Sequence, residues 1–306
     1  MKILTHLKSG VVRSLKSWKG ILFIWLMTLF LISLIALPLK AGLKSLVDSS
    51  MITELLTDTI NIDVVTDLIP GLASLIPAIT RGFLLVFFLA FLMNTFLTGG
   101  LFTLLSGRKD KQSLTVFFTG AASSFWSFLF ITLITTLIIL FSLGLIGGIP
   151  IALVSSSGSG SPAPGAMGRV VRIVIIVIAL MLPLLILVAD FARSWQVAHD
   201  EKKPFKAVGF GFSLTFRTFL LSYPLMLVLM LVQGAYLALV MSKLLASKPL
   251  TGGGVFLLFL GSQLLFVIKI MLRAWRYGSV TSVMEDNVQV PSVAHDQKVS
   301  ELWPSI

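Results

Sequence analysis

Six long apolar blocks are the feature of this sequence that most restricts how the chain can fold. A helix rises about 1.5 Å per residue, so about 20 residues are needed to cross the ~30 Å hydrocarbon layer of a bilayer. The blocks approach that length and lie at residues 20–39, 82–105, 125–150, 169–189, 218–241 and 255–272. Runs such as IVIIVIALMLPLL do not alternate as barrel strands would. The sequence therefore predicts an all-α integral membrane protein with six transmembrane helices within residues 1–278.

The composition agrees with a membrane-embedded chain. Apolar residues make up 56% of the 306 residues and charged residues only 12%, whereas soluble domains carry about 25% charged residues. The first block exceeds the ~7–15 apolar residues of a secretory signal and lacks a good cleavage site, so we interpret it as a retained span. Cysteine is absent, which excludes disulfides and cysteine-ligated metals.

The basic residues predict the orientation of the spans. Short cytoplasmic loops retain Lys and Arg, and most of the 24 basic residues fall on one side if the N-terminus is cytoplasmic and the chain crosses six times. Indole side chains favour the headgroup region, and four tryptophans fall at the predicted inner ends of spans: Trp18, Trp126, Trp195 and Trp275. We predict an integral protein of the cytoplasmic (inner) membrane with both termini cytoplasmic.

The net charge of +11 predicts an anionic inner leaflet as the first binding partner, since each basic residue near it contributes about 1 kcal/mol of attraction. Nucleic-acid binding would need a clustered basic domain. The cytoplasmic segments are too short to fold one, so this class of partner is excluded.

The connecting segments differ in character. Residues 41–80 mix acidic residues with regularly spaced apolar ones, which predicts an outer loop of one or two amphipathic helices with a break at Pro70–Gly71. Residues 154–168 are rich in Gly and Ser and predict a flexible outer loop. Residues 279–306 are predicted to be a polar, partly disordered cytoplasmic tail.

Weakly apolar stretches precede the first, third and fifth spans and predict interfacial amphipathic helices. The second, fourth and sixth spans begin at regular intervals, near residues 82, 169 and 255. Two interpretations remain open. The chain is built from three degenerate repeats, each an interfacial helix followed by a two-helix hairpin, or it is an ordinary array of hairpins.

Asp190 and Arg193 stand where the fourth span leaves the hydrocarbon. An unpaired carboxylate at this depth would be desolvated and costly. The sixth span brings Lys269, Arg273 and Arg276 to the same level, at spacings that place them on one helical face. We predict a structural ion pair from Asp190 to Lys269 or Arg273, beside Arg193. A proton relay is the alternative.

The polar amides within the spans are Asn94, Gln233 and Gln263, and Pro183 and Pro224 interrupt two spans. Broken helices with nearby amides form the substrate sites of some transporters. Interhelical hydrogen bonds, worth about 0.6–2 kcal/mol each, are the simpler interpretation.

Catalytic motifs are lacking. His6, His199 and His295 are scattered without metal-ligand spacing, and no glycine-rich nucleotide loop follows a strand. The sequence predicts no metal, no cofactor and no enzymatic activity.

The segment ADFARSWQVAHDEKKPFKAVGFGF resembles a pattern of uncharacterised prokaryotic six-span families. These include the membrane domain fused to some glycerophosphodiester phosphodiesterases. The matching residues are Asp190, Ala192, Arg193, Asp200 and Ala207. The resemblance implies a six-helix membrane unit, and no lipid cleavage, because the catalytic barrel is missing.

These observations favour a non-enzymatic membrane protein of accessory or scaffolding type. It would bind a membrane or soluble partner through residues 41–80 or through the basic cytoplasmic helices. One alternative is a passive transporter or channel-like protein that uses the amides of spans 2, 5 and 6 for a small solute. A lipid-modifying enzyme is the third interpretation, and it lacks a nucleophile–base pair.

Overall fold

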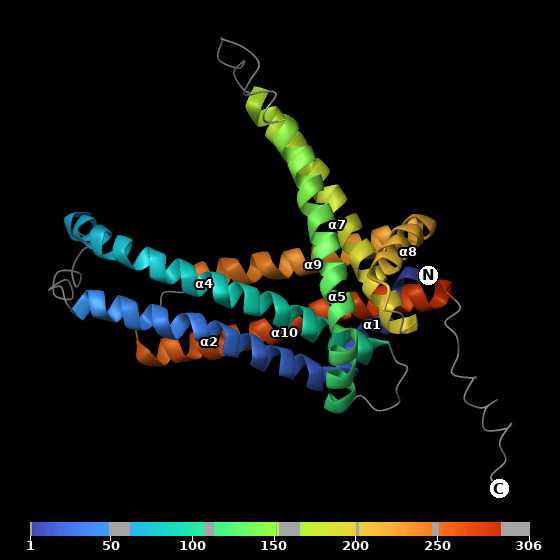
Figure 1. The fold of residues 1–306 in the computed structure, drawn as a ribbon, viewed down its shortest axis with the longest axis horizontal. Coiled ribbons are helices and arrows are strands. Elements are labelled where there is room, and N and C mark those ends of the chain that lie inside the picture. Colours follow the sequence, from blue (N-terminus) through green and yellow to red (C-terminus); the bar gives the residue numbers. More distant parts are fainter. Residues whose placement is uncertain are drawn as a thin grey trace, which may run out of the picture. The chain divides into compact units, whose positions relative to one another are not determined.

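The structure is a computed structural model that describes residues 2–48, 62–106, 113–150, 152, 166–199, 202–246 and 251–288. Within these ranges the chain is helical and contains no strand (Figure 1), so the predicted all-α class is confirmed. The helices are α1 (Lys2–Lys16), α2 (Trp18–Asp48), α4 (Ile62–Leu105), α5 (Leu114–Leu143), the π-helical turn η1 (Gly144–Gly148), α7 (Ala166–His199), α8 (Pro204–Arg217), α9 (Phe219–Ala246) and α10 (Gly252–Asn287).

Five helical segments in the described ranges are long and apolar enough to cross a membrane: Gly82–Leu105, Leu114–Gly148, Met167–His199, Phe219–Leu244 and Gly252–Asn287. A sixth candidate consists of Lys2–Lys16 and Trp18–Leu34, which are bent by 67° relative to each other. The chain is therefore compatible with a multi-pass membrane protein of five or six spans.

The chain divides into two compact units, residues 22–94 and residues 1–21 with 95–306. The smaller unit holds most of α2 and the first part of α4. Its α4 surface is strongly apolar and includes Phe83 and Phe87, whose rings stack with centroids 6.3 Å apart. The larger unit contains every contact discussed below.

The helices at both ends of the predicted outer loop are longer than expected. Helix α4 runs without interruption through Pro70–Gly71, so the break predicted there is wrong. Prolines are tolerated inside membrane helices because other groups satisfy the freed carbonyls. Of the predicted loop 41–80, residues 49–61 lie outside the described residues, as do residues 154–165 of the predicted flexible loop 154–168.

The predicted tail begins too early, because α10 continues to Asn287. Small residues let this part of α10 approach α1 closely: a Cβ added at Gly278 would lie 3.1 Å from the carbonyl oxygen of Gly10. Val280, Val283 and Met284 are buried in the core. Residues 279–287 therefore belong to the packed unit, and 289–306 lie outside the described residues.

Burial within the larger unit is concentrated in one half of each long helix. One cluster of buried apolar side chains joins α7, α8, α9 and α10 around Leu187, Phe191 and Leu225. A second joins α5, α7 and α8 around Ile131 and Trp195. Residues 136–150, 230–244 and 251–269, the predicted outer halves of three spans, contain no buried residue.

Two of the three predicted interfacial segments are separate helices, α1 and α8. The third was predicted before the third span and is instead continuous with it, since α5 runs unbroken from Leu114 to Leu143. Two predicted tryptophan anchors are also used inside the protein: Trp195 is buried, and Trp275 donates a hydrogen bond to the Leu7 carbonyl. Trp18 and Trp126 are exposed.

Three glycines mark the places where helices cross most closely. A Cβ added at Gly211 of α8 would lie 2.5 Å from the Val188 carbonyl oxygen of α7. Added at Gly10 it would meet the backbone nitrogen of Ser279 at 2.7 Å, and at Gly120 the Cβ of Thr103 at 2.5 Å. A side chain is therefore excluded at each crossing, and at Gly10 and Gly211 the glycine faces the backbone of the neighbouring helix.

Candidate functional site

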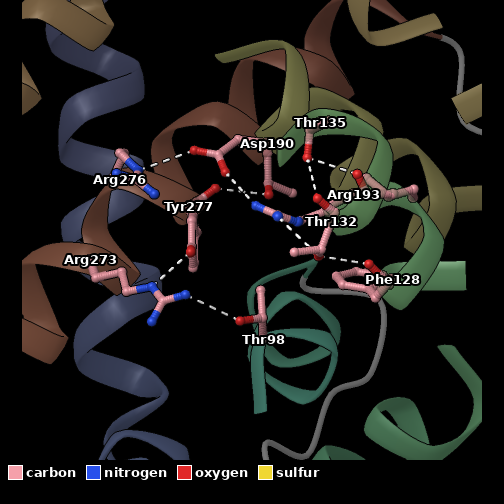
Figure 2. Close-up of polar contacts among 11 residues, drawn as sticks. Thr98, Phe128, Thr132, Thr135, Asp190, Arg193, Arg273, Arg276 and Tyr277 are labelled. Carbon is pink, nitrogen blue, oxygen red and sulfur yellow. Dashed lines mark hydrogen bonds and ion pairs between the residues drawn. The ribbon is translucent and has the colours of Figure 1, made fainter. Parts of the chain in front are cut away.

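A network of charged side chains lies where the packed ends of α7 and α10 meet. Asp190, on α7, is 0% exposed. Its Oδ1 lies 3.3 Å from Nη1 of Arg193, one turn further along the same helix. Its Oδ2 lies 3.1 Å from Nε of Arg276 on α10. Figure 2 shows the carboxylate between the two guanidinium groups. Asp190 therefore bridges two helices.

The network extends to two further helices through threonine hydroxyls. Arg193 Nη2 donates to Thr132 Oγ1 of α5 at 3.2 Å, and Thr132 in turn donates to the Phe128 carbonyl. Arg273 Nη2 donates to Thr98 Oγ1 of α4 at 3.2 Å. Four helices, α4, α5, α7 and α10, are thus tied together by polar contacts (Figure 2).

Tyr277 occupies the middle of the network and is buried. Arg273 Nε donates to its hydroxyl at 2.7 Å. The guanidinium carbons of Arg273 and Arg276 lie 5.3 and 4.9 Å from its ring centroid, within the range of cation–π attraction. Its ring also packs on Phe102 of α4, with centroids 4.6 Å apart.

The partner of Asp190 differs from the predicted one. The sequence predicted Lys269 or Arg273, whereas the structure pairs Asp190 with Arg276 and Arg193. Lys269 lies two turns before Arg276 and is exposed, with its Nζ 5.9 Å from the Phe266 ring. Arg273 is directed to α4. The prediction that the basic face of α10 meets Asp190 is correct. The contact is made by Arg276 and not by Lys269 or Arg273, which lie two turns and one turn earlier on that face.

Some polar atoms of the Asp190 ion pairs lack an aligned hydrogen bond. Among the described residues, Asp190 Oδ2, Arg193 Nε and Arg276 Nε are buried and have no aligned hydrogen-bond partner. The Asp190–Arg276 contact is therefore a charge contact without a well-directed N–H···O bond. Buried polar atoms are normally hydrogen-bonded. The Nε–H groups of Arg193 and Arg276 are exceptions among the described residues.

A second ion pair joins α1 to α10, and the sequence does not predict it because Glu285 falls in the predicted tail. Arg13 Nη2 donates to Glu285 Oε2 at 2.6 Å, and its Nη1 donates to the Leu105 carbonyl at 3.0 Å. Arg13 thus joins α1 to α10 and to α4. The continuation of α10 beyond Tyr277 is what brings Glu285 into reach.

Of the three amides predicted as an intramembrane polar site, Gln233 and Gln263 lie in the larger unit, on α9 and α10. Gln233 of α9 donates to the Leu272 carbonyl of α10 at 3.1 Å, and Tyr236 makes a similar bond to the Leu265 carbonyl. Gln263 is half-buried on α10, and Asn94 is exposed and belongs to the smaller unit. Gln233 is therefore an interhelical tether.

Replacing Gln233 with leucine is expected to remove this tether at a cost of about 0.6–2 kcal/mol in unfolding free energy. The measurement is unfolding in mild detergent. Ser242→Ala, which removes a hydroxyl that bonds within α9 itself to the Leu239 carbonyl, is the matched comparison and should leave the stability nearly unchanged. An unchanged stability of Gln233→Leu would show that the bond does not hold α9 to α10.

A shallow groove of about 490 Å³ lies between α7 and α9. Its lining includes Ala179 and Pro183 of α7 and Gly234 and Ala238 of α9, and every lining residue is apolar. Its lining side chains offer no hydrogen-bonding group to a polar solute. In the described part of the chain no cluster of three His, Cys, Asp or Glu residues could hold a metal ion.

Several residues of the network were not singled out as partners from the sequence. Arg276 carried a signal, since it continues the spacing of Lys269 and Arg273. Tyr277, Thr98 and Thr132 carried none, because single hydroxyls in spans are common and serve their own backbone.

Comparisons of this chain with protein-family models, with curated proteins and with solved structures find no match.

Proposed function

We propose that this chain is a non-enzymatic membrane protein of accessory or scaffolding type, which holds partner membrane helices against the outer halves of its own spans. The observation that carries the proposal is the uneven packing of the larger unit. Its charged network and buried clusters lie at one end, whereas residues 136–150, 230–244 and 251–269 contain no buried side chain. Those halves expose large apolar residues, among them Leu137, Leu231 and Leu257.

The use of the polar groups also favours this function over transport. The Gln233 amide and the Tyr236 hydroxyl bond to backbone carbonyls of α10, and the groove between α7 and α9 is lined only by apolar residues. A carrier for a polar solute needs convergent polar groups in its cavity. A scaffold needs rigid helices with free apolar surface.

The proposal includes an arrangement of six spans in three repeats. Each repeat contains a glycine followed at the fourth and seventh positions by hydroxyl residues, all of them buried: Gly10, Ser14 and Ser17; Gly120, Ser124 and Ser127; and Gly211, Thr215 and Thr218. The three glycines contact α10, α4 and α7 respectively. The same local packing used three times supports an internal repeat.

The proposed orientation places α1 and α8 at the cytoplasmic headgroup region. Each of the two helices buries a face that includes a glycine and a hydroxyl residue, and exposes apolar and basic residues. The exposed residues include Leu4 and Leu15 with Lys8 and Lys16 on α1, and Phe205 with Lys206 on α8. Such surfaces suit the boundary of an anionic leaflet.

Site-directed photo-cross-linking in native membranes tests this function. A photoreactive residue at Leu137 or at Leu257 is expected to give one discrete protein adduct, recovered in stoichiometric amount from mild detergent. The same probe at Phe205, which is equally exposed but on α8, is expected to give none. Lipid adducts alone at Leu137 and Leu257, together with a monodisperse lone chain, would contradict the scaffolding role.

A further inference from the structure

A histidine is buried in the contact between α1 and α10. His6 of α1 is only 3% exposed. Its Nδ1 lies 3.0 Å from the hydroxyl oxygen of Ser282 on α10, and which of the two groups donates the hydrogen bond depends on which ring nitrogen carries the proton. Its Nε2 lies 3.7 Å from Oδ2 of Asp286, one turn further along α10. Both ring nitrogens of His6 therefore face polar groups of α10.

Water reaches one side of this buried ring. The Asp286 side chain is 68% exposed, so its carboxylate is hydrated although it lies next to Nε2 of His6. A proton from solution therefore reaches the ring along the exposed carboxylate, without crossing the packed contact between the helices.

The charged groups around His6 act in opposite directions. The carboxylate of Asp286 favours the protonated ring, whereas Lys2 and Arg13, on the same helix as His6, disfavour it. Arg13 is itself paired with Glu285 of α10 at 2.6 Å. The charge state of the ring thus depends on the balance between one neighbouring carboxylate, two basic groups and the loss of water around the ring.

Helix α9 also packs against α1, and its contact with α1 is apolar. Leu225 and Leu229 of α9 share a buried cluster with Leu7 of α1. The ionisable side chains described on α9 are Tyr223, Tyr236 and Lys243. The two tyrosine hydroxyls bond to carbonyls of α7 and α10, and the lysine lies about four turns beyond Leu229. The charged groups that face His6 among the described residues are therefore those of α1 and α10.

Burial has a larger effect on His6 than the neighbouring carboxylate does. Helix α1 precedes the first predicted span, and burial there lowers the pKa of His6 from its ordinary value of 6.5. Asp286 raises this pKa by less, and Lys2 and Arg13 lower it further. The docked helix therefore favours the neutral ring. The stabilisation that the neutral ring gives is fully present above pH 6.5, and it is lost as the pH falls from 6.5 through the pKa of the docked state.

We propose that His6 makes the docking of α1 onto α10 sensitive to pH, so that acidification of the solution around Asp286 loosens α1. The neutral ring shares a hydrogen bond with Ser282 inside the packed contact. The protonated ring places a positive charge there, and α1 lowers the cost by moving the ring toward water. Trp275 and Arg13 make further contacts between the same two helices, so the response is a partial loosening of α1. It does not depend on the scaffolding role.

Thiol labelling of the full chain in mild detergent measures how often α1 opens. The chain has no cysteine, so a single one is introduced by Ser14→Cys. Ser14 is 2% exposed, and its hydroxyl bonds within α1 itself, so a thiol there reacts when α1 moves away from the helices that cover it. Lys8→Cys, at an exposed position of α1, gives the labelling rate of an open thiol at each pH. The ratio of the two rates is the protection of α1.

With His6 present, the protection is expected to fall between about pH 7.5 and about pH 5.5, by at most about tenfold, which is the limit for a histidine that titrates near 6.5 when released. His6→Gln keeps an amide that can bond to Ser282 but does not titrate, and it is expected to show equal protection at both pH values. The Arg13–Glu285 pair is unchanged in this variant, so any pH dependence due to that pair would remain.

Asp286→Asn provides a second variant. It removes the group that favours the protonated ring, so the fall in protection should be larger than with Asp286, and this comparison replaces His6→Gln if that variant does not fold. Protection that stays constant or rises at the lower pH with His6 present would overturn the proposal. So would a fall that persists in full in His6→Gln, or one that becomes smaller in Asp286→Asn.

Discussion

Replacing Asp190 with asparagine is expected to lower the free energy of unfolding by about 3–5 kcal/mol, the usual cost of removing one partner of a buried ion pair. The carboxylate is fully buried between Arg193 and Arg276. Its neutral amide would leave two desolvated guanidinium groups without a counter-charge. Reversible unfolding in mild detergent measures the loss.

A double-mutant cycle identifies the partner. The loss caused by Asp190→Asn is expected to be partly masked when Arg276→Gln is also present, because the uncompensated charge is then removed. Lys269→Gln is the matched control on the same helix, and its effect should simply add to that of Asp190→Asn. If Lys269→Gln couples to Asp190 and Arg276→Gln does not, the contact between α7 and α10 is misassigned.

Replacing Gly211 with alanine is expected to destabilise the chain by about 1–3 kcal/mol, as is typical of overpacking. The added Cβ would lie 2.5 Å from the Val188 carbonyl oxygen and 3.2 Å from the Ala192 nitrogen. Both are backbone atoms of α7 that cannot rotate away. Helix α8 would therefore have to move from α7, and the detergent melting temperature should fall.

Gly209, two residues earlier on the same helix, provides the control. No atom lies within 4 Å of a Cβ built there. Gly209→Ala should therefore stabilise the chain by roughly 0.5–1 kcal/mol, because alanine loses less backbone entropy than glycine in a helix. Equal effects at Gly209 and Gly211 would mean that the α7–α8 crossing is not closely packed.

The sequence was sufficient to predict the helical class and the region of the charged network. An apolar run long enough to span the bilayer forms an α-helix in lipid, because its backbone N–H and C=O groups must hydrogen-bond to each other within the segment. Asp190 and the basic face of α10 could be matched by depth, because each lies at the end of an apolar run. Which of the three cations is nearest depends on the axial offset between two helices, and that offset is set by packing.

Two helix boundaries differ from their predictions for the same physical reason. Residues 279–287 were assigned to a polar tail because Ser279, Ser282 and Glu285 are polar. Small hydroxyl side chains, however, permit close helix contact, and Glu285 is neutralised by Arg13. In the same way, the hydroxyl residues of the segment before the third span suggested a separate interfacial helix. They belong instead to the first part of the continuous helix α5. Polarity alone does not distinguish surface from tight packing.

The contacts between α1 and α10 restrict when α1 can take its final position during synthesis. Trp275 binds the Leu7 carbonyl, and Arg13 binds Glu285, across almost the whole length of the chain. During synthesis at about 5–20 residues per second, α1 leaves the ribosome tens of seconds before α10 exists. Until then the face of α1 that carries Gly10 and Ser14 has no α10 to pack against. Helix α1 therefore reaches its final place only after α10 has been made, and a nascent chain stopped before residue 270 would lack both contacts.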